Sequence, residues 1–137
     1  MWAGRIVAAE GGLFALMRPS TDLSEVFVCL EPIDFRKGIT GLAALVEAEL
    51  ERNPFAAALY LFSKRRRDRV KLLYWERNGF CLWQKRLEKE RFHGLRSADS
   101  RVEVIAGQQL NWLLDGYDIA RIKPHKSLNY SYVSWYS

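Results

Sequence analysis

The chain has 137 residues, 49% of them hydrophobic, which is enough for one domain with a sizeable core. Its net charge of +5 and isoelectric point near 9.4 favour an acidic partner such as nucleic acid, although an anionic membrane or an acidic protein would fit the same balance. Two cysteines, Cys29 and Cys81, without any C-x-x-C spacing argue against a metal or redox motif and for reduced core residues of a cytoplasmic protein.

Residues 1–24 show no sustained hydrophobic period, so we expect a flexible N-terminal arm. The apolar stretch from Ile6 to Met17 is interrupted by Glu10 and two glycines. It makes a poor signal peptide and is too short to span a bilayer, so no membrane contact is expected.

A short strand and a helix are predicted next. The branched, apolar run Val26–Leu30 is typical of a buried strand, and Pro32 ends it. From Thr40 to Arg52 the leucines and Val46 recur at helical spacing, and Asn53-Pro54 stops the helix.

The charged residues before this helix have two interpretations. Arg36 and Lys37 beside a helix N-terminus could contact a phosphate group. Alternatively, Asp34 caps the helix or pairs with Arg36, with Thr40 as another candidate cap, and we prefer this structural interpretation.

A hairpin dominates the middle of the chain. Leu59–Phe62 predicts a strand, and two more are expected at Val70–Glu76 and Phe80–Leu87. They are joined at Asn78-Gly79, the dipeptide favoured in a two-residue type I′ turn. That turn would place Trp75 opposite Leu82 and Lys71 opposite Arg86.

The two faces of the hairpin differ in composition. The expected core face carries Val70, Leu72, Tyr74, Cys81, Trp83 and Leu87. The other carries Arg69, Lys71, Arg77 and Arg86 around Leu73, Trp75, Phe80 and Leu82, and continues into the basic run Lys64–Arg67. Cations interleaved with rings suit a nucleic acid, because cations neutralise phosphates and rings stack on bases. The alternative is that a helix covers this face.

The remaining segments complete an α+β prediction. Ala106–Asp115 predicts a second helix ended by Gly116, Arg101–Ile105 could be strand or loop, and Arg91–His93 could add a short edge strand. We therefore expect one domain over residues 25–120. It would hold a small, mostly antiparallel sheet of four to five strands around a central hairpin, packed by two helices, in the order β-α-β-β-β-α. Residues 121–137 form an irregular basic and aromatic tail that either docks on a partner or packs back on the sheet.

Catalytic and metal motifs are absent from the sequence. His93 and His125 lie in unlike contexts, and no phosphate loop, dinucleotide glycine pattern or G-x-S-x-G occurs. A nuclease would need convergent acids such as Asp34, Glu76 and Asp99, which the sequence does not bring together. No enzymatic activity, cofactor or metal is therefore expected.

Several ordered motifs resemble one known family. They are CLEPIDFRKG from Cys29, GLAALV from Gly41, NPF from Asn53, RDRVKLLYW from Arg67, NGFCLW from Asn78, KRLEK from Lys85, and QLNWLLDGYDI from Gln109, followed by KPH and LNY. Together, from about Val26 to Ser134, they resemble the small accessory protein, often called TnpB or the second-reading-frame protein, of insertion sequences of the IS-sixty-six type. The chain departs at Ala56-Ala57 and Gly94-Leu95, where relatives commonly carry Ser-Gly and Trp-Pro.

The resemblance implies a bacterial accessory protein of DNA transposition, encoded beside a separate transposase. One hypothesis is that it binds DNA, such as the element ends, and helps assemble the transposase complex. The contacts would be Arg36, Lys37, Arg65, Arg66, Arg67, Arg69, Lys71, Arg86 and the ring of Trp75. The other is an adaptor that binds the transposase through apolar and aromatic surface, including the tail from Tyr130 to Tyr136, without touching DNA. The sequence leaves the oligomeric state open, a homo-oligomer included.

Overall fold

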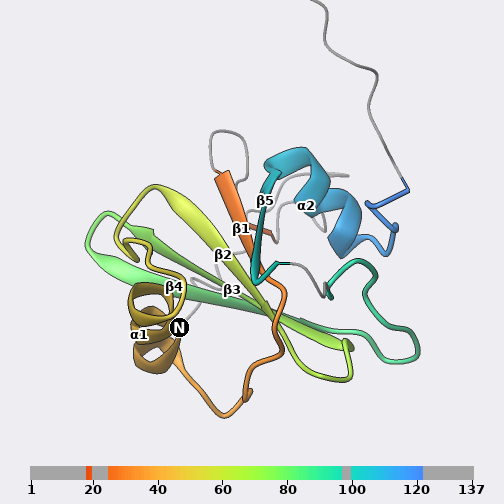
Figure 1. Ribbon diagram of the computed structural model, residues 1–137, viewed down its shortest axis with the longest axis horizontal. Helices are drawn as coiled ribbons and strands as arrows, with labels where there is room; N and C mark the ends of the chain where they lie inside the picture. Colours follow the sequence, from red (N-terminus) through yellow and green to blue (C-terminus); the bar gives the residue numbers. More distant parts are fainter. Residues whose placement is uncertain (1–17, 20–24, 97–99, 122–137) are drawn as a thin grey trace, which may run out of the picture.

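The computed structural model describes residues 18–19, 25–96 and 100–121. The elements follow one another as β1 (Glu25–Cys29), α1 (Ile39–Ala48), β2 (Ala58–Ser63), β3 (Arg69–Glu76), β4 (Gly79–Arg86), β5 (Val102–Ala106) and α2 (Gly107–Leu114) (Figure 1). Both predicted helices and the predicted α+β class are confirmed. The arm before residue 18 and the tail after residue 121 lie outside the described residues.

One five-stranded sheet runs through the domain in the order β4-β3-β2-β1-β5. Three of its four pairings are antiparallel, whereas β1 and β2 are parallel because α1 crosses between them. The sheet is therefore mixed but mostly antiparallel, as predicted, and the parallel β1–β2 pair is a minor departure from that expectation. The fifth strand is β5, and the segment Arg91–His93, expected as a possible edge strand, is loop.

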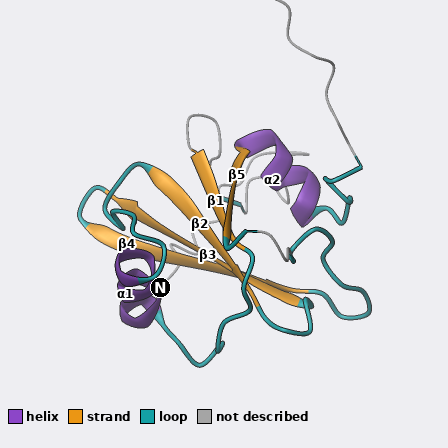
Figure 2. Cartoon of the chain, in the orientation of Figure 1, coloured by secondary structure: helices purple, strands orange, loops and turns teal. Residues whose placement is uncertain are grey.

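A helix covers each face of the sheet (Figure 2). On one face α2 packs Leu110, Leu113 and Leu114 into a cluster with Val26, Val28, Leu30, Leu59, Leu61, Val70, Leu72, Phe92, Leu95 and Ile105. On the other, α1 packs Leu42 and Val46 into a cluster with Phe27, Cys29, Leu50, Ala58, Tyr60, Phe62 and Leu73. Because both faces are buried, the central strands are apolar on both sides.

The hairpin register differs from the expected one by two residues. Glu76 pairs with Gly79 and Trp75 with Phe80, so the loop residues are Arg77 and Asn78. Of these, Arg77 has the positive φ, at 52°. The turn therefore begins one residue earlier than the Asn-Gly pair suggested. A shift of two residues leaves each side chain on its predicted face, so the division into two faces holds.

Candidate nucleic-acid interface

Three loops leave the sheet at the same end, which we call the loop end. The parallel β1–β2 pair and the antiparallel pairs that β3, β4 and β5 make put the end of β1, the end of β2, the start of β3, the end of β4 and the start of β5 on the same side. The described loop residues there are 30–38, 64–68, 87–96 and 100–101. Among the described residues of these loops and the adjoining strand ends, there are twelve lysines and arginines but only five carboxylates. The cations are Arg36, Lys37, Lys64, Arg65, Arg66, Arg67, Arg69, Arg86, Lys89, Arg91, Arg96 and Arg101, and the acids are Glu31, Asp34, Asp68, Glu88 and Glu90. The positive charge of the chain is thus concentrated at one end.

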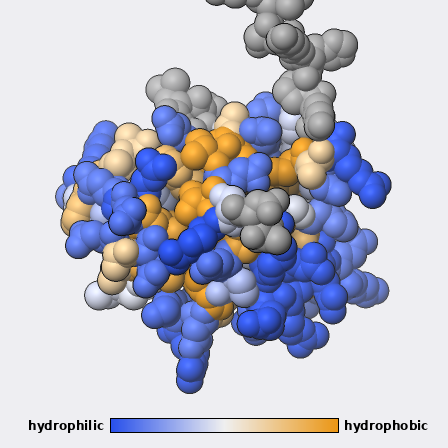
Figure 3. Space-filling model, in the orientation of Figure 1, coloured by the Kyte–Doolittle hydropathy of each residue, from blue (hydrophilic) through white to orange (hydrophobic). Residues whose placement is uncertain are grey.

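Hydrophilic side chains gather over this end, at the lower right of the space-filling view (Figure 3). Some of them project from the tight connection between β2 and β3, Lys64–Arg67, which we call the basic turn. Arg65 and Arg66 are exposed and Arg67 is half-buried. The loop end is therefore the most consistently polar part of this face (Figure 3).

Backbone hydrogen bonds close the basic turn. The Arg67 N–H donates to the carbonyl of Lys64 at 2.8 Å, and the Lys64 N–H donates to the carbonyl of Arg69 at 3.3 Å. Arg67 has a φ of +60°, a left-handed conformation that disfavours a side chain with a Cβ. An arginine at such a position costs stability that a glycine would not, and strain of this kind is a pointer to function.

The segment after β4 wraps around the basic turn and binds it at three points. The N–H of Leu87 donates to the carbonyl of Asp68 and that of Phe92 to the carbonyl of Arg67, each at 2.7 Å. At the third point, Arg96 Nη2 donates to the carbonyls of Lys64 at 2.8 Å and Arg65 at 2.9 Å. The turn is therefore fixed by its neighbour before any ligand arrives.

Arg96, which the sequence reasoning did not single out, makes the side-chain contacts to the basic turn. Its Nη1 also donates to Ser63 Oγ at 3.0 Å and to its own neighbour's carbonyl at Leu95, so both terminal nitrogens are engaged. Burial lowers the pKa of Arg96, and the nearby charges of Arg67 and Arg65 lower it further. A lone arginine in a loop gives no periodic signal, and only its partners in space reveal the role.

Some cations at the loop end have carboxylate partners and others do not. Arg86 pairs with Glu88 at 3.0 Å, and Arg101 bridges Glu31 and Glu49 at 3.2 and 2.9 Å. Within the described ranges no carboxylate pairs with Arg65, Arg66, Arg67 or Arg69. An anion brought to this turn would therefore relieve repulsion rather than compete with an existing salt bridge.

Arg69, at the end of the turn, is only half-exposed. Its Nε, like Asp68 Oδ1 beside it, is buried without a hydrogen-bond partner in the described part of the chain. On β4, Arg86 lies directly opposite Arg69 in the ladder. This pair places two further guanidinium groups beside the basic turn, as the sequence predicted for both residues.

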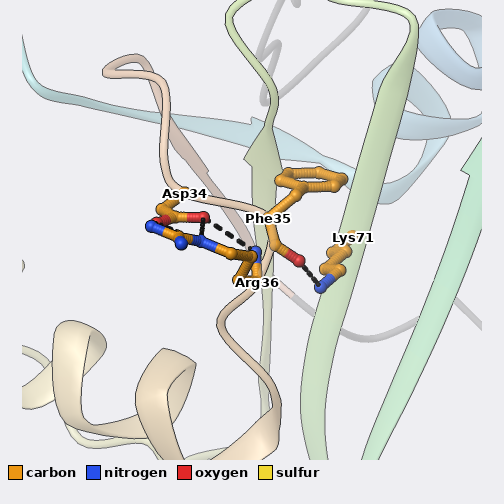
Figure 4. A network of polar contacts seen from close by, with 4 residues as sticks. All are labelled: Asp34, Phe35, Arg36 and Lys71. Carbon is orange, nitrogen blue, oxygen red and sulfur yellow. Dashed lines mark hydrogen bonds and ion pairs between the residues drawn. The ribbon is translucent and has the colours of Figure 1, made fainter.

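Lys71, predicted to contact the nucleic acid, is buried, so this prediction was wrong. The residue is 6% exposed, and its ammonium points into the protein rather than into solvent. It donates to the carbonyl oxygens of Phe35 at 2.9 Å and Lys37 at 2.8 Å, and it lies 4.8 Å from the centre of the Phe35 ring (Figure 4). Burial is the main reason that its pKa is lowered. The strand face that was expected to be open is the face that α1 and this loop cover.

Arg36 and Lys37 lie in that same loop, with both side chains exposed. Arg36 binds Asp34 through Nε at 3.0 Å and Nη2 at 2.6 Å (Figure 4). These bonds lower the pKa of Asp34 to about 2. The N-cap of α1 is Gly38, without any side-chain cap, so neither Asp34 nor Thr40 caps the helix. The predicted Asp34–Arg36 pairing is present.

Trp75 is separated from the basic turn by the length of β3. Trp75 lies six residues along the strand from Arg69, about 20 Å at the usual rise. Its ring packs edge-on against Phe55 at 4.9 Å and Phe80 at 5.0 Å between centroids. The structure therefore gathers Arg65, Arg66, Arg67, Arg69 and Arg86 at one end, with Arg36 and Lys37 on a neighbouring loop, and leaves Trp75 in a separate aromatic cluster.

The described residues contain no group of three His, Cys, Asp or Glu side chains placed to hold a metal ion. Among those residues, no helix is long and apolar enough to cross a membrane. Of the acids considered for a nuclease, Asp34 lies at the loop end and Glu76 at the opposite end of β3, whereas Asp99 falls outside the described ranges.

Comparison with known proteins places the chain in a defined context. A family model described as "IS66 Orf2 like protein" matches residues 24–124. The uncharacterized protein y4jC of Sinorhizobium fredii is 32% identical over 108 residues, which cover 79% of this chain and 91% of that protein. Another uncharacterized protein of the same organism, y4hO, is 33% identical over 102 residues, covering 74% and 88%. No solved structure matches the chain.

Proposed function

Because the chain belongs to the IS66 Orf2-like family and is thus an accessory protein of an insertion sequence, we propose that it binds DNA through the loop end. The basic turn makes the principal contact, Arg69 and Arg86 extend it, and Arg36 and Lys37 form a second, smaller contact. Bound in this way in the cytoplasm, the protein helps to assemble the element's transposase on the element ends.

The observation that carries the proposal is the unpaired charge of a turn held in one shape. Arg65, Arg66 and Arg67 have no carboxylate partner in the described residues, and three backbone and side-chain attachments hold their turn in place. A preorganised cluster of guanidinium groups binds phosphates with little ordering cost, and arginine is suited to phosphate through its planar fork of donors. We expect the cluster to contact mainly the phosphate backbone, so the affinity should be largely independent of base sequence.

A salt series tests the proposal. Purified protein is titrated with a duplex of the element end and with an unrelated duplex, and log affinity is plotted against log salt concentration. We expect a steep linear decline of about 0.9 per phosphate neutralised, with similar slopes on both duplexes. In the double variant R65Q/R66Q the slope should become shallower by about 1.8.

A matched control keeps the loss of charge constant. Arg52 and Arg77 are exposed and lie at the opposite end of the sheet, before β2 and between β3 and β4. The variant R52Q/R77Q therefore removes the same charge and should keep the slope of the unaltered protein. Equal slopes in the two double variants would mean that net charge, and not the basic turn, accounts for binding.

The adaptor function remains a second candidate, supported by the aromatic cluster. Phe55 is 53% exposed and packs on both Trp75 and Phe80. Exposed aromatic groups of this kind are typical of protein-binding hot spots. If the protein binds no DNA at low salt, calorimetric titration with the purified transposase tests whether it is an adaptor. In that case F55S should weaken the association with the transposase.

The proposed role is architectural, with the chemistry of strand transfer left to the transposase. Incubation of supercoiled plasmid with the protein and magnesium or manganese should leave the plasmid intact. Nicked or linear product would instead require metal ligands that the sequence and the described structure do not suggest.

A further inference from the structure

Arg96 occupies a position that neither the family motifs nor the charge pattern singled out. It lies in the segment after β4, yet its guanidinium binds three consecutive residues at the end of β2 and the start of the basic turn: Ser63 Oγ and the carbonyls of Lys64 and Arg65. Because these bonds use both terminal nitrogens, little of the group remains free to take a phosphate itself.

The bonds of Arg96 have two physical effects on the basic turn. They join two segments that have no strand pairing with each other, and so limit the conformations open to Lys64 and Arg65. They also satisfy the carbonyl oxygens of Lys64 and Arg65, two backbone acceptors of the basic turn. The side chains of Arg65 and Arg66 are exposed and have no carboxylate partner among the described residues.

Resting on the proposed DNA-binding function, we infer that Arg96 is the positioning residue of the DNA site. It holds the basic turn in the shape that presents Arg65 and Arg66 together to adjacent phosphates of the DNA backbone. This role depends on the planar shape of the guanidinium and not on its charge alone. A lysine ammonium cannot donate to the same four acceptors at once, which are Ser63 Oγ and the carbonyls of Lys64, Arg65 and Leu95.

The test compares R96K with the unaltered protein. R96K keeps the charge, so an effect of charge alone would leave DNA binding unchanged. If Arg96 positions the turn, R96K binds duplex DNA about tenfold more weakly at fixed salt, and the slope against log salt becomes shallower by about 0.9 or more. Amide hydrogen exchange supplies a readout without DNA: the Arg67 N–H, bonded to the Lys64 carbonyl, should exchange faster in R96K.

Lys85 provides a control for a general loss of stability. It too anchors a neighbouring segment from a half-buried position, donating from Nζ to the carbonyl of Leu114 at 2.8 Å, but this residue is the C-terminal end of α2. K85Q and R96Q each remove one charge and one anchor. Only R96Q should weaken DNA binding beyond about twofold.

The outcomes separate the two ideas. If the unaltered protein binds DNA and R96K matches it in affinity and slope, the inference about Arg96 is overturned while the proposed function stands. Equal weakening in R96Q and K85Q would also overturn it, because stability would then explain the effect. If the unaltered protein binds no DNA at low salt, the proposed function falls and takes this role of Arg96 with it.

Discussion

The ammonium of Lys71 donates a 2.9 Å hydrogen bond to the carbonyl of Phe35 and so ties β3 to the loop that leads into α1. The same group binds the carbonyl of Lys37, which means that one buried lysine satisfies two backbone acceptors in a loop without regular structure. A lysine buried in this way serves the fold.

Replacing Lys71 by methionine should lower the free energy of unfolding by about 1–3 kcal/mol, because two carbonyl oxygens lose their partner under a packed layer. Urea denaturation followed by circular dichroism measures the change. K89M, at an exposed lysine, should stay within about 0.5 kcal/mol of the unaltered protein. If K71M folds with full stability but binds DNA poorly, this prediction is wrong and Lys71 contributes to DNA binding.

Glycine at position 67 should separate stability from binding. Because Arg67 has a φ of +60°, R67G relieves backbone strain and should leave stability unchanged or raise it by up to about 1 kcal/mol. R67Q keeps the strain and serves as the matched variant. Both should reduce the salt slope of DNA binding by about 0.9, and thermal unfolding should distinguish them. A clear loss of stability in R67G alone would show that the arginine side chain stabilises the turn.

The carboxyl group of Asp34 should titrate with a pKa of about 2, because Arg36 binds its charged form. A folded-state pKa below that of the unfolded chain means that this pair stabilises the fold above about pH 4 and ceases to do so as the pH falls toward 2. Carbon-detected NMR of the Asp34 side chain follows the titration directly. In R36Q the midpoint should move up toward that of an ordinary aspartate, and an unchanged midpoint would assign the shift to another cause.

Trp75 should matter for stability and not for DNA. W75A removes one of three mutually packed rings and should cost about 1–3 kcal/mol in free energy of unfolding. Its DNA affinity, measured well below the melting temperature, should stay within about twofold, since the basic turn lies at the far end of β3. A loss comparable to that of R65Q/R66Q would place the ring at the nucleic acid after all.

Much of the fold could be predicted from the sequence because helices and hairpins leave local sequence patterns. The helical spacing of Leu42, Leu45 and Val46 and the alternation along the hairpin depend only on near neighbours, and both were interpreted correctly. The turn was misplaced because Asn-Gly is a statistical preference. The chain instead turns at Arg77-Asn78 and accepts a positive φ at the arginine.

The candidate site was harder to predict, because the burial of a side chain depends on segments that are distant in the sequence. Val70–Leu73 reads as a strand with one lysine, and whether that lysine faces water depends on where residues 33–37 pass, which no local pattern shows. The near-continuous apolar run around Lys71 was the available signal, since strands covered on both faces lose their alternation. Arg96 gave no such signal.

The position of β1 in the sheet has a consequence for how the protein is made. One edge of β1 pairs with β2. The other edge pairs with β5, which begins at Val102 and is therefore synthesised long after β1. Until then a nascent chain presents an apolar, unpaired margin that invites association with other chains. Production at reduced translation rate or without chaperones should therefore favour insoluble material, and truncation before β5 should do so most of all.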